Sequence, residues 1–282
     1  MHQPIDPVSR LNDIDICGFR LTEFRQPALM RTPKHSHEYT TIFMTLGGCG
    51  RDNLIGREFD CRPNSILVRP AGVDHTHDYG REGIHGLVIE VKPDRLENIR
   101  SISRVLDQVG SYQDIFLNSL VTRTVLESRI MDSASELAIE GLALELLAHL
   151  ARRESGPPAS GKLPLWLDQA VEFIRGHFAE PIPLAQIAAQ VGVHSAHLSE
   201  VFRRHHGCSI GEYVRRLRLD QAAGQVMWSK APLAEISANA GFYDQSHFTK
   251  LFKRHTGLAP GEMRAIMGKP PVNTRKPRFV QD

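Results

Sequence analysis

The 282-residue sequence lacks several features that would place it outside the soluble globular class. It has no apolar run close to the roughly 20 residues that a membrane-spanning helix needs. Its first ten residues include Asp6 and two prolines but no basic segment followed by an apolar one, so we expect no signal peptide. The four cysteines lie far apart without a CxxC pair, which argues against disulfides or a zinc finger. These absences predict a cytoplasmic protein with no membrane partner.

Charge is almost balanced in the whole chain but not in its halves. The formal net charge is +2, and 41% of the residues are hydrophobic, which excludes a disordered polymer. Residues 1–159 carry 18 basic and 22 acidic residues, whereas residues 160–282 carry 16 basic and 10 acidic residues. Such an asymmetry indicates a polyanion-binding module joined to a second domain.

The boundary between these halves coincides with a segment that is rich in glycine, proline and serine. This segment, residues 154–163, lacks large apolar residues at its centre and predicts an interdomain linker. A second segment of biased composition is the basic, proline-containing tail at residues 269–282, which we expect to be disordered.

The basic half contains an internal repeat. Residues 184–192 (LAQIAAQVG) match residues 233–241 (LAEISANAG), and after one inserted residue the match continues from 197–207 to 247–257. In each copy, apolar residues recur at helical spacing in two short segments. Each copy therefore predicts a helix-turn-helix, whose second helix can enter the major groove of DNA.

Glycines and helix caps mark the limits of these helices. Gly207 and Gly257 stand where the second helix of each copy is expected to end. Ser209 and Glu212 form a capping box, which predicts the start of a helix of about 20 residues, roughly 30 Å long. A rod of this length can place two helices in successive major grooves, because one turn of B-DNA is about 34 Å.

The stretch 241–260 (GFYDQSHFTKLFKRHTGLAP) carries a family resemblance. Residues 164–268 resemble the DNA-binding domain of the AraC/XylS family of transcription regulators. The resemblance implies seven helices, with two helix-turn-helix units joined by a long helix, and sequence-specific binding of double-stranded DNA.

Side chains on the exposed face of each second helix are the candidates for reading DNA. Asp244 and His194 are expected to cap these helices. Glutamine pairs with adenine, lysine with guanine, alanine with a thymine methyl group and glutamate with the cytosine amino group, although a solvated helix face is the alternative for each of them. Arginine and lysine one turn further on suit phosphate. The expected DNA-binding residues are Ser195, Ala196, Ser199, Glu200, Arg203, Gln245, Ser246, Thr249, Lys250, Lys253 and Arg254.

The acidic half changes its periodicity near residue 93. Before this point, short β-branched and aromatic runs, such as residues 40–46 and 65–68, alternate with turn residues and favour a barrel or jelly roll. After it, the pattern predicts helices over residues 94–108, 113–129 and 133–153. The third has an apolar face that either packs on the barrel or dimerises: Leu137, Leu144, Leu147, Ala148 and Ala151.

Histidines gather before one predicted strand and after another. His35 and His37 precede a strand and share a face if that strand extends over them, and His75 can converge from a second strand. Three imidazoles suit Zn²⁺, Ni²⁺ or Fe²⁺, so His35, His37 and His75 are the metal candidates. The other readings are a pocket for an organic effector, lined by His35, His37, Tyr39 and His75, and a purely structural role.

This region resembles a cupin barrel, the fold that AraC-type effector domains often have. The HxH at His35 and the PxGxxH ending at His75 match the two cupin motifs. The carboxylate that a metal-binding cupin places after HxH is missing, since Thr40, Thr41 and Ile42 stand there. The resemblance therefore implies an effector pocket and no metal or other cofactor.

The fold predicted from these observations is α+β and multidomain, with a cupin-like β-barrel followed by an all-α domain. Its parts are the barrel at 1–93, a helical dimerisation segment at 94–153, the linker at 154–163, the DNA-binding domain at 164–268 and the tail at 269–282. The leading hypothesis is a homodimeric, non-enzymatic transcription regulator under the control of a small-molecule effector, with RNA polymerase as a partner if it activates. The alternatives are a metal-dependent cupin isomerase or dioxygenase with a DNA-binding tail, and a nonspecific architectural DNA protein.

Overall fold

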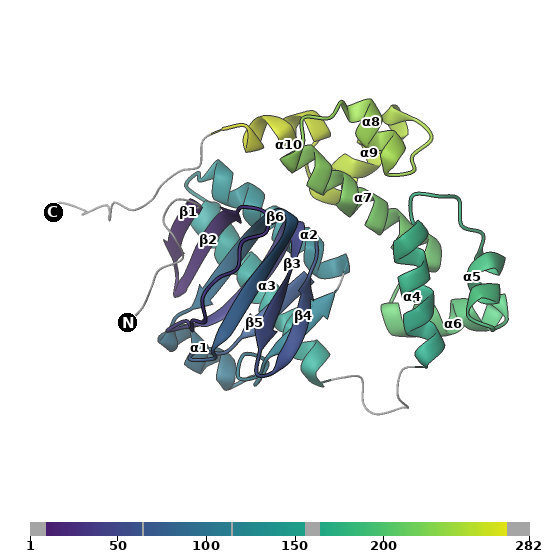
Figure 1. Cartoon of the computed structure of the whole chain (residues 1–282). Helices are drawn as coiled ribbons and strands as arrows, with labels where there is room; N and C mark the ends of the chain where they lie inside the picture. The colour runs from purple at the N-terminus through teal and green to yellow at the C-terminus, as the bar shows by residue number, and fades with distance from the viewer. Residues whose placement is uncertain (1–9, 64, 114, 156–163, 270–282) are drawn as a thin grey trace. The chain divides into compact units, whose positions relative to one another are not determined.

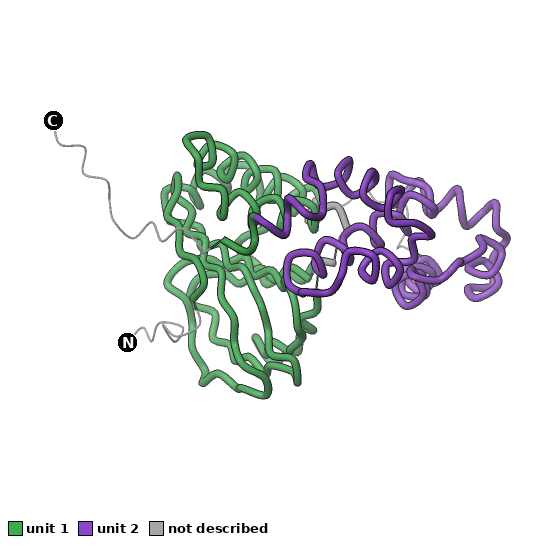
Figure 2. Tube along the Cα trace, turned by 90° about the horizontal axis from the view of Figure 1, so that it is seen from above, with its two compact units in different colours: residues 1–155, 266–282 green, residues 156–265 purple. Residues whose placement is uncertain are grey.

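A computed structural model describes residues 10–63, 65–113, 115–155 and 164–269 (Figure 1). The chain divides into two compact units, which are coloured separately in Figure 2. The N-terminal unit comprises residues 1–155 with 266–282, and the C-terminal unit comprises residues 156–265. The expected linker and tail lie almost entirely outside the described residues.

The N-terminal unit is built on a seven-stranded antiparallel sheet. The strands pair in the order β1-β2-β6-β3-β5-β7, and β4 pairs with β3 beside this path. The two longest strands, β3 and β6, pair with each other at the centre. The strands are β1 (Arg10–Ile16), β2 (Phe19–Gln26), β3 (Thr40–Leu54), β4 (Arg57–Cys61), β5 (Ser65–Arg69), β6 (His75–Val91) and β7 (Gly110–Gln113).

Strand β3 runs well past the strand that was predicted over residues 40–46. The glycines that follow residue 46 produce bulges within one continuous strand instead of a turn, since the register with β6 shifts at two places between Thr45 and Gly50. Gly48 has a φ of +71°, and a Cβ atom there would lie 2.1 Å from the carbonyl oxygen of Gly83. Only glycine fits this approach, which lets the paired strands bend without ending.

Three helices accompany the sheet: α1 (Pro93–Arg100), α2 (Ile115–Ile130) and α3 (Ser135–Ser155). The prediction of a helix over 94–108 is wrong beyond Arg100. There the carboxylate of Asp107 accepts hydrogen bonds from Arg100 Nε (2.7 Å) and Arg104 (2.9 Å) and thereby holds the chain in a turn. The chain then forms β7, which pairs with β5.

Helix α3 has a mixed apolar surface. It packs against α2 and buries Ile139, Leu142, Ala143, Leu146 and Leu150. Of the residues in the predicted apolar face, Leu147 is buried, whereas Leu137 and Leu144 are 75% and 41% exposed. The predicted face is thus divided between the interior and solvent.

A buried ionic network ties α2 to the sheet. The carboxylate of Glu23 on β2 accepts hydrogen bonds from Arg129 on α2, at 2.6 and 2.7 Å, and contacts His85 Nε2 on β6 at 2.9 Å. All three side chains are buried. On β1, the amide of Asn12 donates to the carbonyl oxygen of Ser128 at 3.0 Å.

From residue 164 onward, helices are the only regular secondary structure in the described residues, and all of these except residues 266–269 belong to the C-terminal unit. Its seven helices agree with the number that the family resemblance implies. They are α4 (Leu165–His177), α5 (Leu184–Gln190), α6 (Ser195–His206), α7 (Ile210–Trp228), α8 (Leu233–Asn239), α9 (Gln245–Thr256) and α10 (Pro260–Met267). An antiparallel sheet unit followed by a helical unit confirms the α+β fold class.

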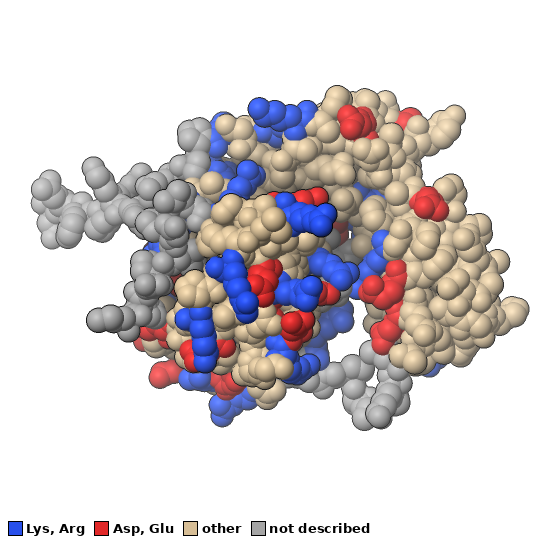
Figure 3. All heavy atoms as spheres, in the orientation of Figure 1, with Lys and Arg blue, Asp and Glu red and all other residues tan. Residues whose placement is uncertain are grey.

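None of the helices in the described part of the chain is both long and apolar enough to cross a bilayer. On the face shown in Figure 3, Lys and Arg alternate with Asp and Glu over the N-terminal unit instead of separating by sign. Both signs are numerous in the first half of the sequence, where residues 1–159 carry 18 basic and 22 acidic residues.

Candidate functional site

Helix α9 is the second helix of the second repeat copy. Its N-cap is Asp244, as predicted, and the Oδ1 atom accepts a hydrogen bond from the backbone N–H of His247 at 2.6 Å. Phe248 and Phe252 are fully buried and fix the inner face. The Thr249 hydroxyl donates to the carbonyl oxygen of Gln245, and this side chain is half-buried. The exposed candidates on this helix are Gln245, Ser246, Lys250, Lys253 and Arg254.

Helix α6 occupies the equivalent place in the first copy. Its N-cap is His194, whose Nδ1 accepts from the backbone N–H of Ala196 at 3.3 Å, a weaker contact than that of Asp244. Leu198, Val201 and Phe202 form its buried face. Ala196, Glu200 and Arg203 are exposed, whereas Ser195 and Ser199 are half-buried. We call α6 and α9 the recognition helices.

Helix α7 connects the two helix-turn-helix units. Its 19 residues span about 28 Å. The predicted capping box is present: Ser209 Oγ accepts from the backbone N–H of Glu212 at 3.2 Å, and Glu212 Oε2 accepts from the backbone N–H of Ser209 at 2.8 Å. Helix α7 therefore begins where the sequence predicts.

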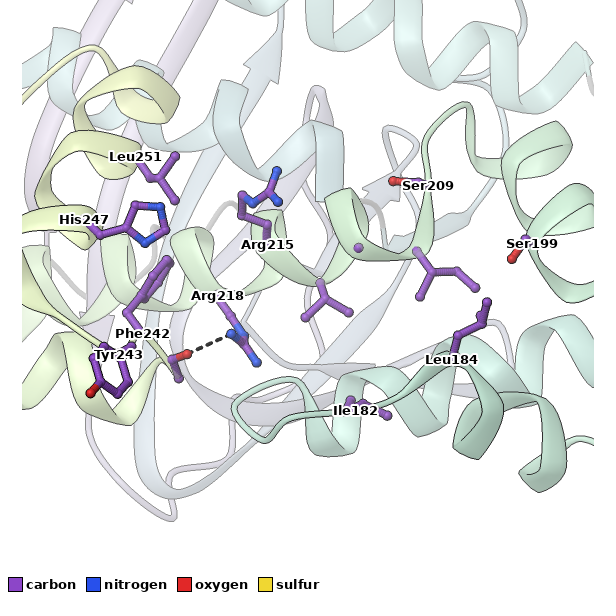
Figure 4. A pocket seen from close by; sticks show the side chains of 14 residues that line it. Ile182, Leu184, Ser199, Ser209, Arg215, Arg218, Phe242, Tyr243, His247 and Leu251 are labelled. Carbon is purple, nitrogen blue, oxygen red and sulfur yellow. Dashed lines mark hydrogen bonds between the residues drawn. The ribbon is translucent and has the colours of Figure 1, made fainter. Parts of the chain in front are cut away.

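Arg218, near the middle of α7, binds the backbone of the segment before the first helix-turn-helix unit and of the turn within the second. Its guanidinium donates to the carbonyl oxygens of Phe178 (2.6 Å) and Glu180 (2.9 Å), which lie between α4 and α5. It also donates to the carbonyl oxygen of Gly241 (2.7 Å), in the turn before α9 (Figure 4). We call these three hydrogen bonds the Arg218 clamp. Burial of the guanidinium lowers its pKa.

Gly241 brings the second helix-turn-helix unit close to the segment between α4 and α5. The sequence predicts only a helix-ending glycine at this position. The structure adds a close contact, because a Cβ atom at Gly241 would lie 2.3 Å from the carbonyl oxygen of Ala179, and its φ is +79°. The turn of the second helix-turn-helix unit thus packs directly against the segment that joins α4 to the first unit.

A cavity of about 620 Å³ lies along α7 and is shared by both units (Figure 4). Ser199 of α6 lines it from one side, and His247 and Leu251 of α9 line it from the other. Arg215 of α7 lines it between them and is exposed. Arg215 is therefore a basic side chain between the recognition helices that the sequence analysis did not select.

A second constellation lies in the N-terminal unit, where four histidines converge. His35 and His75 pair through their backbones, with N···O distances of 3.0 and 2.8 Å. The ring centroid of His37 lies 4.9 Å from that of His75, and the centroid of His77 lies 5.0 Å from it. We call His35, His37, His75 and His77 the histidine cluster.

The cluster forms in a different way from the one predicted. His35 and His37 were expected to share a strand face if the following strand extended over them, but β3 begins only at Thr40 and the segment carrying them forms isolated bridges. It is His75 and His77, on β6, that share a strand face. Tyr39 is half-buried, and among the described residues no hydrogen bond or ring contact joins it to the cluster.

Three of the rings are oriented by acceptors at Nδ1. Nδ1 donates to the carbonyl oxygen of Pro33 in His35 (2.9 Å) and to that of Val73 in His75 (3.0 Å). In His77, Nδ1 contacts the carboxylate of Asp52. Since carbonyl and carboxylate oxygens accept only, the proton of each neutral ring lies on Nδ1 and the lone pair on Nε2.

A buried arginine faces two of these lone pairs. Arg69 Nη1 lies 2.9 Å from His75 Nε2 and 3.0 Å from His77 Nε2. Its guanidinium also stacks over the Phe43 ring, with 4.9 Å to the centroid. Burial lowers the pKa of Arg69 to about 10, which leaves it a cation at neutral pH.

All four histidines are neutral at physiological pH. Burial is the main cause of the lowered pKa values, which fall to about 2 for His37 and about 3 for His75 and His77. The positive charge of Arg69 lowers the pKa of His37 and His75 further. Burial also lowers the pKa of His35.

Sequence reasoning missed three members of this site: His77, Asp52 and Arg69. His77 could have been found, because it stands two residues after His75 and therefore on the same strand face. Asp52 is the cross-strand partner of His77 on β3, and Arg69 reaches the cluster from β5. Neither of these carries a local signal, since pairing between distant strands brings them in.

Comparisons with known proteins agree with both parts of this architecture. Residues 17–150 match the family model described as the AraC-like ligand binding domain, and residues 187–266 match that of a helix-turn-helix domain. The chain is 28% identical over 240 residues to the arabinose operon regulatory protein of Salmonella typhimurium, covering 79% of this chain and 82% of that protein. It is 26% identical over 255 residues to the HTH-type transcriptional activator RhaR of Yersinia pestis, covering 85% and 87%.

Fold and matches together define a transcription regulator with a ligand-binding N-terminal domain and a helix-turn-helix DNA-binding domain. The chain belongs to the AraC family of transcription regulators. The relatives named above are regulators, which are not enzymes.

Proposed function

We propose that the protein is a sequence-specific regulator of transcription whose DNA binding is controlled by a small molecule held in the N-terminal domain. The observation that carries this proposal is the C-terminal unit, in which one helix and the Arg218 clamp hold two capped recognition helices with exposed polar faces. Two rigidly connected recognition helices suit a bipartite operator. A DNA target is consistent with the expected cytoplasmic location.

Base reading and phosphate binding are assigned to different side chains. In this proposal the exposed residues of the first turns read bases, since the N-terminal part of a recognition helix contacts base edges. Arg203, Lys253 and Arg254 bind phosphate, and Arg215 adds a phosphate contact between the two grooves. The base-reading set is Ser195, Ala196, Ser199, Glu200, Gln245, Ser246, Thr249 and Lys250.

The effector site is assigned to the histidine cluster and its surroundings. His35 and His37 are half-buried, whereas His75 and His77 are buried. Neutral imidazoles and the Arg69 guanidinium offer hydrogen-bond acceptors and donors to a polar ligand. Tyr39 is proposed as a further residue that contacts the effector.

The proposal is tested by selecting bound fragments from genomic DNA with the purified full chain. A site recovered in this way should bind at least about 1,000-fold more tightly than a scrambled duplex of equal length at one fixed salt concentration. Equal affinities for the two duplexes would replace specific regulation with an architectural role. If transcription from the selected promoter rises, RNA polymerase is the expected partner, since RhaR is named as an activator.

A homodimer is part of the proposal. The exposed residues Leu137, Gly141 and Leu144 of α3 follow one another at helical spacing and offer an apolar stripe to a second copy. Replacing Leu144 with glutamate should shift the chain from dimer to monomer in light scattering coupled to size exclusion. Glu145→Gln, at an exposed polar position beside it, is the matched control. A wild-type monomer at micromolar concentration would contradict dimerisation.

A further inference from the structure

The histidine cluster has the arrangement that a transition-metal ion requires. One ring nitrogen from each of His35, His75 and His77 lies within 4.8 Å of the others. Three imidazoles with an open fourth position are a common ligand set for Zn²⁺ and related ions.

The surroundings of the three rings strengthen this assignment. Metal-binding histidines almost always donate their second ring nitrogen to a carbonyl or carboxylate oxygen, which orients the ring and raises its basicity. Here His35 and His75 do so toward Pro33 and Val73, and His77 Nδ1 contacts the carboxylate of Asp52. The carboxylate that a metal-binding cupin uses as a ligand after HxH is missing. Asp52 provides a carboxylate of a different kind, since it contacts Nδ1 of His77 and not the position of the ion.

The guanidinium of Arg69 lies between the Nε2 atoms of His75 and His77. One nitrogen of its guanidinium serves both His75 and His77, at 2.9 and 3.0 Å, so a cation already stands between these rings. A metal ion can take this place only if Arg69 withdraws, because the two charges repel each other.

Asp52 offers Arg69 a second position. Arg69 Nη1 lies 3.6 Å from Asp52 Oδ2, which is too long for a hydrogen bond. Both Asp52 Oδ2 and Arg69 Nε are buried without a hydrogen-bond partner. A short movement of the guanidinium toward Asp52 would satisfy both atoms and free the two imidazole lone pairs.

We propose that His35, His75 and His77 bind a divalent transition-metal ion, and that Arg69 occupies the place of the ion until it binds. The inference rests on the proposed function in placing the effector at this cluster, and it makes metal the effector or a part of its site. When the metal ion replaces the guanidinium, Arg69 moves from His75 and His77 to Asp52. Such a movement gives ligand binding a conformational consequence within the sheet.

The test is titration of the metal-free full chain with Co²⁺ in the absence of DNA, followed by visible absorption and calorimetry. One Co²⁺ per chain is expected, with Zn²⁺ displacing it. His35→Ala and His77→Ala should weaken binding at least about 100-fold, and Asp52→Asn about 10- to 100-fold. Arg69→Met should strengthen it at least about tenfold, because no cation must then be displaced.

Controls separate metal binding from folding and from DNA recognition. His197→Ala removes an exposed histidine of the C-terminal unit and should leave Co²⁺ affinity unchanged. Circular dichroism checks each variant, and His35→Ala keeps the test interpretable if the buried His77 variant fails to fold. Wild-type protein that binds no stoichiometric Co²⁺, or binds it as weakly as His35→Ala, overturns the proposal. Binding by Arg69→Met alone would also overturn it. Binding of the selected DNA by the metal-free chain is measured separately. Absence of Co²⁺ binding would therefore overturn the metal site without overturning sequence-specific DNA binding.

Discussion

Glu200 illustrates how a neighbouring side chain changes what one residue offers to DNA. As an isolated carboxylate on a recognition helix it would repel phosphate. In the structure it accepts a hydrogen bond from Arg204 at 2.6 Å, one helical turn further on. The pair is largely exposed, so it contributes little to stability. It does, however, offset the negative charge of Glu200 and leaves a carboxylate oxygen for a cytosine amino group.

Gln245 is the residue where base reading is most directly tested. Replacing it with alanine should cost about 1–3 kcal/mol at one base pair of the selected site and relax discrimination there. Competition among single-base variants of the site measures both effects. Gln169→Ala, on the exposed side of α4, is the control. An unchanged preference at every base pair would remove Gln245 from the base-reading set.

Arg254 should behave differently, because a phosphate contact carries no sequence information. Arg254→Ala is expected to weaken all DNA sequences alike and to reduce the slope of log affinity against log salt by about one unit. Binding isotherms at several salt concentrations, for the selected and the scrambled duplex, measure both quantities. Arg152→Ala in α3 serves as the control. A loss confined to the selected duplex would make Arg254 a base-reading residue.

Individual residues were predictable where a local pattern specified them. Asp244, His194 and the Ser209–Glu212 pair cap helices as the sequence indicates, because capping depends on neighbours within three positions. Asp52 and Arg69 were not predictable. Their roles arise from strand pairing and burial, which no short segment of sequence encodes.

Among the elements, α2 depends most visibly on one buried charge. Burial by itself would raise the pKa of Glu23, but the hydrogen bond with His85 and the charge of Arg129 outweigh it and lower the pKa. A carboxyl group with a lowered pKa stabilises the folded state above its unfolded pKa of about 4.3. That contribution is lost as the pH falls through the folded pKa. Helix α2 is therefore held to the sheet by an interaction that acid removes.

Glu23→Gln should destabilise the N-terminal domain by about 3–5 kcal/mol at pH 7, because Arg129 remains buried without its counter-charge. The difference between wild type and variant should shrink as the pH falls below about 4. Urea unfolding followed by far-ultraviolet circular dichroism measures the free energies at each pH. Glu82→Gln, at an exposed position of β6, is the control. A difference that stayed constant with pH would show that the charge of Glu23 is not the cause.

Element boundaries were predictable to different degrees. The repeat specified the helices of the C-terminal unit, since their periodicity, caps and glycines agree with one another. The strands were less predictable, because the glycines after residue 46 read as a turn until their partner strand is known. The end of α1 was not predictable, because the contacts that follow it, from Arg100 and Arg104 to Asp107 and from β7 to β5, lie beyond the helical pattern itself.

At the scale of the DNA-binding domain, the Arg218 clamp sets the relation between the two recognition helices. Arg218→Met should weaken binding to an operator that spans both major grooves at least about tenfold, which is about 1.4 kcal/mol. Binding to a duplex carrying one half-site should change little, because each helix-turn-helix unit keeps its own core. Electrophoretic mobility shifts on the two duplexes measure the ratio.

Gly241→Ala provides an independent variant of the same feature. Its Cβ atom would collide with the backbone at Ala179, so the two units could not keep their contact. Gln221→Met, at an exposed position of α7, is the matched control for Arg218→Met. Equal losses on the bipartite and half-site duplexes would mean that Arg218 stabilises the fold without setting the spacing.

The clamp has a further consequence for mutational tolerance. All three acceptors are main-chain carbonyl oxygens, and every amino acid supplies one. In a saturation library selected for DNA binding, position 180 should accept most residues, since only its backbone is used. Position 218 should accept arginine alone, because no other side chain reaches three carbonyls with a planar fork of donors. The permitted substitutions would thus distinguish two kinds of contact. A contact between two side chains restricts both positions, whereas a contact between one side chain and main-chain carbonyl oxygens restricts only the position of that side chain.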